Sequence, residues 1–194
     1  MKQGIADPER KKLYIKLLSD TWEIADQARL LQLDDISTRY YHDVRKKRTQ
    51  DLAAYNTNVL MHILESFNDD LAVSGLLSDS NIDAVLKRHE DTQKFMFLQT
   101  WSNSYWTTED EADAQGMLKS ELIPVNDLCL FTSAVMLSLM ECFDLRKLMW
   151  LLDAYQHGNV YVSQRALIGI VFALHIHTCL LYTSPSPRDR QTYR

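Results

Sequence analysis

The fold is decided by residues 128–177, where LCLFTSAVMLSLMECF (128–143) is followed by LRKLMWLLDAY (145–155) and VYVSQRALIGIVFALHIH (160–177). Apolar residues recur at three- and four-residue spacing in each segment, and only short polar breaks separate the segments. This spacing predicts three helices that stack against one another. The first helix is apolar nearly all round, so we expect neighbours to cover it on several sides.

Composition supports helices throughout the chain. Of its 194 residues, 46% are hydrophobic and 24% are charged, which is typical of a folded protein. It has only five glycines and four prolines, too few for the turns that an all-β fold needs at short intervals. We therefore predict an all-α protein of antiparallel helical hairpins. The net charge of -5 comes from nearly balanced acids and bases, so neither nucleic acid nor a membrane is expected as a partner.

The first 122 residues predict an amino-terminal helical region. Apolar residues recur there at helical spacing, and clusters of Asp, Asn and Ser separate the recurring segments. The predicted helices span residues 8–33, 37–67, 81–105 and 108–122. Asn68-Asp69-Asp70 is expected to interrupt the pattern between the second and the third of these helices.

Short polar side chains mark the expected helix starts, because their oxygen atoms accept hydrogen bonds from the free amides of the first turn. The predicted N-caps are Asp7, Asp34 or Asp35, Thr108, Asn126 and Asp144. Glu111 follows Thr108 by three residues, which predicts a capping box. Gly158 follows the helix over residues 145–156, and we expect it to end that helix in the left-handed conformation.

The segment VSQRALIGIV (162–171) resembles the inner helix of a HEAT-type repeat, in which a polar start with an arginine precedes Ala-Leu and closely packed small and aliphatic residues. Tetratricopeptide-like pairs of antiparallel helices are equally compatible with residues 126–178. The resemblance implies a helical bundle over residues 1–122 that leads into an α-solenoid (HEAT/TPR-like) over residues 123–178. Ala166 and Gly169 would then let a neighbouring helix approach closely.

The end of the chain differs in kind. The segment CLLYTSPSPRD (179–189) looks like the translation of the transposon end and adjoining adapter used in sequencing libraries. The match implies that residues 179–194 are a non-native tail and that the chain is a truncated fragment, whose native sequence continues past Thr178. On this interpretation, an apolar patch beside residues 166–177 is first of all an interface with the missing remainder.

No catalytic, cofactor-binding or metal-binding residue is predicted. His175, His177 and Cys179 are spaced two apart, and on a helix such positions differ by about 200°, so they do not converge on one ion. The basic run over residues 45–48 is interpreted as the solvated face of a helix, because no aromatic residues interleave with it.

Two features of the sequence indicate the cellular compartment. The three cysteines match no zinc-binding spacing and are expected as buried thiols in a reducing compartment. The amino terminus has no apolar signal segment, which predicts a cytoplasmic protein, although Met1 is alternatively an internal methionine of a longer reading frame. No apolar run reaches the roughly 20 residues that a membrane-spanning helix requires.

The sequence therefore predicts a non-enzymatic scaffold for protein–protein interaction, because stacked helix pairs create extended surfaces. Its expected partner is another protein or the missing carboxy-terminal remainder of the same protein. Two alternatives stay open. One is the helical accessory region of an enzyme whose catalytic domain lies beyond residue 178. The other is a helical bundle that binds a small apolar ligand among Trp101, Trp106 and Trp150.

Overall fold

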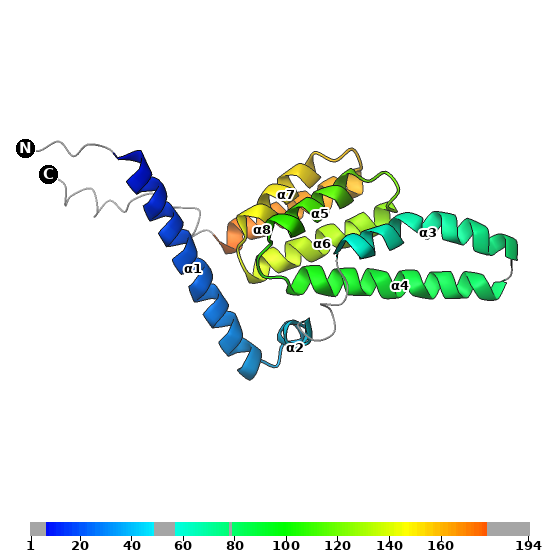
Figure 1. Cartoon of the computed structure of the whole chain (residues 1–194), viewed down its shortest axis with the longest axis horizontal. Helices are drawn as coiled ribbons and strands as arrows, with labels where there is room; N and C mark the ends of the chain where they lie inside the picture. Colours follow the sequence, from blue (N-terminus) through cyan, green and yellow to red (C-terminus); the bar gives the residue numbers. More distant parts are fainter. Residues whose placement is uncertain (1–6, 49–56, 78, 178–194) are drawn as a thin grey trace, which may run out of the picture. The chain divides into compact units, whose positions relative to one another are not determined.

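The computed structural model describes residues 7–48, 57–77 and 79–177. These residues form eight α-helices and no strand, which confirms the predicted all-α class. The chain divides into two compact units, Met1–Lys47 with helices α1 and α2 and Arg48–Arg194 with helices α3 to α8 (Figure 1). The tail predicted over residues 179–194 lies outside the described residues.

The first unit pairs α1 (Pro8–Ile36) with α2 (Tyr40–Lys47). Asp7 caps α1 as predicted, because its Oδ1 atom accepts hydrogen bonds from the amides of Glu9 and Arg10 at 3.1 and 3.3 Å. The predicted helix over residues 37–67 is described only at its two ends, since residues 49–56 lie outside the described part of the chain.

The prediction that Asp34 or Asp35 caps the second helix is wrong, because α1 continues through both residues. Asp34 instead joins the two helices: Oδ1 lies 2.6 Å from Nδ1 of His42, and Oδ2 accepts a hydrogen bond from Nε of Arg45 at 3.0 Å. These partners hold the carboxylate more strongly than exposed amides would. Arg45 is therefore bound inside the unit, which corrects its interpretation as part of a solvated face.

The second unit contains six described helices. They are α3 (Thr57–Leu77), α4 (Asp79–Ser102), α5 (Thr108–Lys119), α6 (Val125–Glu141), α7 (Leu145–Tyr155) and α8 (Val160–Ile176). The break predicted at residues 68–70 is absent, since α3 runs through them. Asn68 and Asp69 are exposed, so their weak helix propensity costs only a few tenths of a kcal/mol there. Asp70 accepts a hydrogen bond from the Ser66 hydroxyl at 3.1 Å.

The capping box of α5 begins one residue earlier than predicted. Oγ1 of Thr107 accepts a hydrogen bond from the Asp110 amide at 3.1 Å, and Oδ2 of Asp110 accepts one from the Thr107 amide at 2.8 Å. Glu111 has a different partner, since its carboxylate pairs with the Arg146 guanidinium on α7 at 3.1 Å. The Glu111 side chain, which the local pattern assigned to the capping box, therefore forms a long-range ion pair instead.

We expect Thr107→Ala to lower the free energy of unfolding by about 1 kcal/mol, because it removes the acceptor of the first-turn amide. Thr108→Ala is the matched control, since both threonines are exposed and only Thr107 caps the helix. Urea unfolding followed by circular dichroism measures both changes. A larger loss in Thr108→Ala than in Thr107→Ala would contradict the assignment.

Two other predicted helix boundaries need correction. Pro124 and not Asn126 precedes α6, and no side-chain cap is formed there. Gly158 has no positive φ, because α7 ends in a tighter turn in which the Gln156 amide bonds to the Asp153 carbonyl at 3.0 Å. The cap predicted at Asp144 is confirmed, since its Oδ1 accepts a hydrogen bond from the Arg146 amide at 2.9 Å.

The six helices lie in two rows, with α3, α5 and α7 in one row and α4, α6 and α8 in the other (Figure 1). Neighbours within a row run parallel, because the residues in contact advance together along both helices. In the first row these pairs are Met61 with Gly116, Glu65 with Ser120, Glu111 with Arg146, and Gln115 with Asp153. In the second row they are Gln93 with Asp127, Asn103 with Ser138, Met136 with Gly169, and Leu139 with His177.

Helices of opposite rows run antiparallel where they form hairpins. On α3 and α4, the Phe67 ring stacks on His89 at a centroid distance of 3.6 Å, and Asp70 lies 3.8 Å from Arg88. On α7 and α8, the hydroxyl of Ser163 donates to the Tyr155 carbonyl at 2.8 Å. The predicted antiparallel arrangement is therefore present in both hairpins.

Hydrogen bonds along the rows recur at a nearly constant separation in sequence. Those from α4 to α6, from α5 to α7 and from α6 to α8 join residues 34 to 38 positions apart. The bond from α3 to α5 spans 55 positions, because α3 and α4 have 21 and 24 residues against 12 and 17 in α5 and α6. Each helix thus meets the helix two places further along the chain.

One apolar core lies between the rows, and it includes fully buried Leu64, Phe131, Trp150 and Leu151. Residues on both sides of position 123 contribute to it. The division into a bundle over residues 1–122 and a repeat region over residues 123–178 stays a prediction.

Candidate protein-binding surface

Helices α6 and α8 have equal length, 17 residues, and occupy consecutive places in one row, but they differ in burial. Nine residues of α6 are buried, and Val125 is its only exposed large apolar side chain. Only five residues of α8 are buried, although its sequence is apolar nearly all round. A helix with that pattern is ordinarily covered on all sides. The exposed part of α8 is therefore the first candidate for a functional surface.

The covered side of α8 consists mainly of small residues. They are Val162, Ala166, Gly169, Ile170 and Ala173. A Cβ atom at Gly169 would lie 3.1 Å from Cβ and Cγ of Met136 and 3.2 Å from Cδ1 of Leu151. The close helix approach predicted at Ala166 and Gly169 is thus confirmed, since Ala166 is fully buried as well.

The outer side of α8 carries eight exposed large apolar residues, with exposed fractions from 43% to 64%. They are Val160, Tyr161, Leu167, Ile168, Val171, Phe172, Leu174 and Ile176. At roughly half exposure each, they present on the order of 800 Å² of apolar surface, whereas the largest patch on a typical monomer covers about 300–600 Å². We call this set the outer face of α8.

Spacing on the outer face suits a facing helix. Leu167, Val171 and Leu174 follow one another at four and three residues, the alternation by which a helix presents a seam to a partner helix. Exposed Leu145, Met149 and Leu152 repeat this alternation on α7, and we call them the α7 row.

Charge is nearly absent from these surfaces. Arg165 is the one formally charged residue of α8, and its guanidinium donates to the Tyr161 carbonyl within the same helix at 3.2 Å. The charged residues of α7 point to other partners: Arg146 pairs with Glu111, Asp153 accepts a hydrogen bond from Gln115, and Lys147 is buried. The outer face and the α7 row therefore favour an apolar partner over a charged one.

A second candidate site is the polar network around Lys147, which is fully buried. Its ammonium donates to the carbonyls of Asn103 and Ser104 and to the Ser138 hydroxyl, and it lies 5.8 Å from the Trp106 ring centroid. Burial lowers the pKa of Lys147 to about 8, and the nearby Asp144 carboxylate opposes that shift. All three N–H donors are used inside the protein. The network therefore clamps the loop after α4 to α6 and α7.

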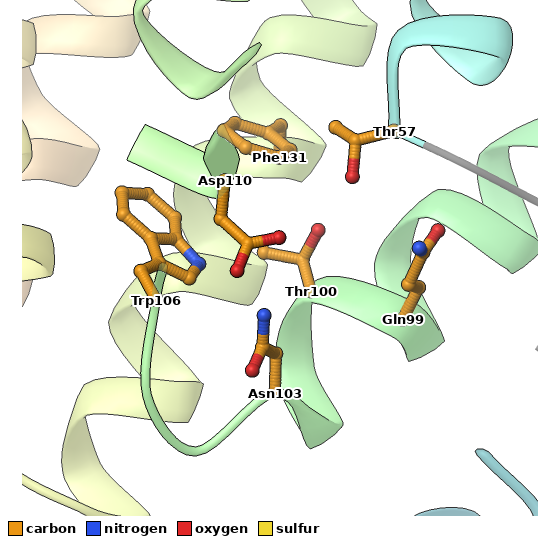
Figure 2. Close-up of a pocket in the computed structure, with 7 residues that line it drawn as sticks. All are labelled: Thr57, Gln99, Thr100, Asn103, Trp106, Asp110 and Phe131. Atoms are coloured by element: carbon orange, nitrogen blue, oxygen red, sulfur yellow. The ribbon is translucent and has the colours of Figure 1, made fainter. Parts of the chain in front are cut away.

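Figure 2 shows the small cavity beside this network. Its lining residues are Thr57, Gln99, Thr100, Asn103, Trp106, Asp110 and Phe131. Its volume of about 10 Å³ is room for roughly one water molecule. The structure brings Trp106 and Trp150 together, with ring centroids 6.2 Å apart, whereas Trp101 contacts Phe97. The space left beside Trp106 suits water and not an apolar ligand.

A third candidate is the buried carboxylate of Asp127 at the start of α6. Its Oδ1 atom accepts a hydrogen bond from Nε2 of Gln93 at 2.5 Å, and its Oδ2 atom lies 3.2 Å from Nε2 of His89 without the geometry of a hydrogen bond. The His89 ring stacks on Phe67. The cluster joins three helices, α3, α4 and α6, and we assign it a structural role.

Sequence reasoning missed both Lys147 and Asp127. A usable signal exists for Lys147, which shares the spacing of buried Leu151 and Ala154 on α7 and so belongs to the covered side. Of the histidines considered for metal binding, His177 is placed with Nε2 2.7 Å from the Leu139 carbonyl, and Cys179 lies outside the described residues.

Comparison with protein-family models, with curated proteins and with solved structures found no match for the chain. Within residues 7–48, 57–77 and 79–177, no group of three His, Cys, Asp or Glu side chains is arranged to hold a metal ion. In the same residues, no helix combines the length and the apolar character needed to cross a bilayer.

Proposed function

We propose that the chain is a non-enzymatic helical scaffold that binds another protein through the outer face of α8 and the α7 row. The contrast between α6 and α8 carries the proposal. Both helices have the composition of covered helices. Among the described helices α3 to α8, α6 has a neighbour in its row on each side, whereas α8 has one. An exposed apolar area on the order of 800 Å² matches what one partner contributes to a standard stable interface.

The α-solenoid resemblance belongs to the same proposal. Successive helices in a row meet at separations of 34 to 38 residues, close to the repeat lengths of tetratricopeptide and HEAT-type units. Parallel rows joined by antiparallel hairpins are also what stacked helix pairs produce. A reducing, cytoplasmic location fits the buried free thiols of Cys129 and Cys142.

Site-specific photocrosslinking tests the proposal. Benzoylphenylalanine replaces Leu167 or Val171 on the outer face, or exposed Glu90 on α4 as the control, and the full chain is irradiated in an extract of the cells that encode it. We expect one protein to be joined at positions 167 and 171 and not at position 90. Crosslinking that is absent from both outer-face positions, or equal at all three, contradicts the proposal.

The captured protein is then purified and titrated against charge variants. Leu167→Glu and Val171→Glu are each expected to weaken binding at least about tenfold, because a buried unpaired carboxylate at an apolar interface costs more than 1.4 kcal/mol. The unfolding free energy should change by less than about 0.5 kcal/mol, since both side chains are exposed in the unbound chain. Unchanged affinity would show that the partner binds elsewhere.

A further inference from the structure

We infer that the partner at the outer face of α8 and the α7 row is an antiparallel helical hairpin, whose second helix runs parallel to α8. The inference rests on the proposed function and specifies the partner that the surface fits.

Continuity with the interfaces inside the unit supports a helix parallel to α8. Parallel packing occurs twice in the same row, from α4 to α6 and from α6 to α8. On α8 the small residues Ala166, Gly169 and Ala173 are buried, and at the second interface Gly169 lies against the larger side chain of Met136. The outer face again offers larger side chains at helical spacing, so a further helix with small residues would fit there in the same way.

The partner is a hairpin because both α7 and α8, and not α8 alone, expose rows of apolar side chains. Contacts made by α7 and α8 on the preceding helices involve both rows: Trp150 donates through Nε1 to the Ala114 carbonyl of α5, while Gly169 meets Met136 of α6. The α7 row is exposed as well, on the helix that packs against α8. A single helix would cover one of these surfaces and leave the other exposed.

The α3–α4 hairpin of a second copy fits this surface less well. It exposes few large apolar side chains, Val59, Val73 and Leu86 among those described, and α4 carries Lys87, Arg88 and Asp91 along the groove that it lines with α3. A two-fold pairing through α8 itself would place the large side chains of one outer face against those of the other. That arrangement departs from the α6–α8 interface, where Gly169 of α8 lies against Met136.

The test supplies a hairpin in the position inferred. A second copy of residues 143–177 is inserted directly after His177 of the full chain, so that His177 and residues 143–144 form a three-residue junction of the same length as that by which α6 leads into α7. The inserted copy carries Val171→Ile, which distinguishes its peptides by mass. Hydrogen–deuterium exchange then reports on the original α8. We expect its amides to exchange at least about tenfold more slowly than in the unmodified chain, because α8 becomes covered on two sides.

The matched control is Leu167→Glu with Val171→Glu in the original α8. In the unmodified chain these substitutions should leave exchange within about twofold, because the positions are exposed, and in the inserted chain they should erase the slowing. Circular dichroism of the inserted chain should show added helix.

Three outcomes overturn the inference: an inserted copy without added helicity, exchange of α8 that stays within about twofold after insertion, or an unmodified chain that sediments as a dimer which the two glutamates dissociate. In the last case the partner is a second copy. If photocrosslinking at positions 167 and 171 succeeds while insertion gives no protection, the proposed function stands and the hairpin inference fails. Absence of crosslinking tells against the proposed function itself.

Discussion

Lys147→Ala is expected to lower the free energy of unfolding by about 4 kcal/mol, because it opens a cavity and removes the charged donor that three buried acceptors share. The acceptors are the carbonyls of Asn103 and Ser104 and the hydroxyl of Ser138. The loss should spread beyond α7, since the same ammonium attaches the loop after α4 to two other helices. Urea unfolding followed by tryptophan fluorescence measures the change.

Lys147→Met separates the two causes. Methionine keeps most of the buried volume and lacks the ammonium, so we expect a loss of about 2 kcal/mol, with the difference from alanine reporting the cavity. Removing the cost of burying the charge offsets part of the lost hydrogen bonding. If both variants were as stable as the original chain, Lys147 would not clamp the loop.

Alkaline pH gives the same residue a second signature. The pKa of Lys147 falls from 10.5 in the reference state to about 8 in the folded protein, mainly because of burial. Between these values the unfolded chain holds a proton that the folded chain has released, so the contribution of Lys147 to stability rises with pH. The rise is at most about 1.4 kcal/mol per pH unit. We expect the stability difference between the original chain and Lys147→Met to grow from pH 8 to pH 10. A constant difference would contradict the lowered pKa.

Gly169→Leu is the second change with a large expected effect, a loss of about 3 kcal/mol or more. Even a single Cβ atom there would lie only 3.1 Å from the Cβ and Cγ atoms of Met136, so a leucine side chain must push α8 away from α6. Thermal and urea unfolding measure the loss, and weaker packing of α8 on the unit should appear as faster amide exchange in that helix.

Gly75→Leu provides the matched control, because Gly75 lies in α3 with no atom within 4 Å of a Cβ built on it. Leucine has the higher helix propensity, so we expect Gly75→Leu to raise stability by about 0.5–1 kcal/mol. Similar losses at both glycines would mean that helix packing at Gly169 is looser than the structure describes.

Helices were the most predictable part of this protein. Apolar spacing located six of the eight described helices well, whereas the helix predicted over residues 37–67 covers α2 and only the first half of α3. The resemblance-based expectation of close packing at Gly169 was correct. Helix ends were less predictable, because local and distant partners compete for the same side chain. Glu111 illustrates the difficulty. The local pattern assigned it to a capping box, whereas its carboxylate forms an ion pair with Arg146, 35 residues away.

The candidate surface was partly predictable. The sequence predicted an apolar helix over residues 160–177 that a neighbour would have to bury, and the structure identifies which side of it is buried. The Lys147 network was hidden because its partners include backbone carbonyls 43 and 44 residues away, which leave no trace in side-chain patterns. The corrected interpretation of Arg45 has the same physical reason, since its partner Asp34 had an equally plausible local role as a helix cap.

The ordering of contacts along the rows also determines how the unit would respond to a mechanical load. Its main helix contacts join helices no more than two places apart in the chain, and α8 is held mainly by α6 and α7. Tension applied at the carboxyl end of α8 would therefore be resisted by one interface at a time, and the helices would detach successively instead of together. The unit would therefore lengthen in several small steps and not in one cooperative event.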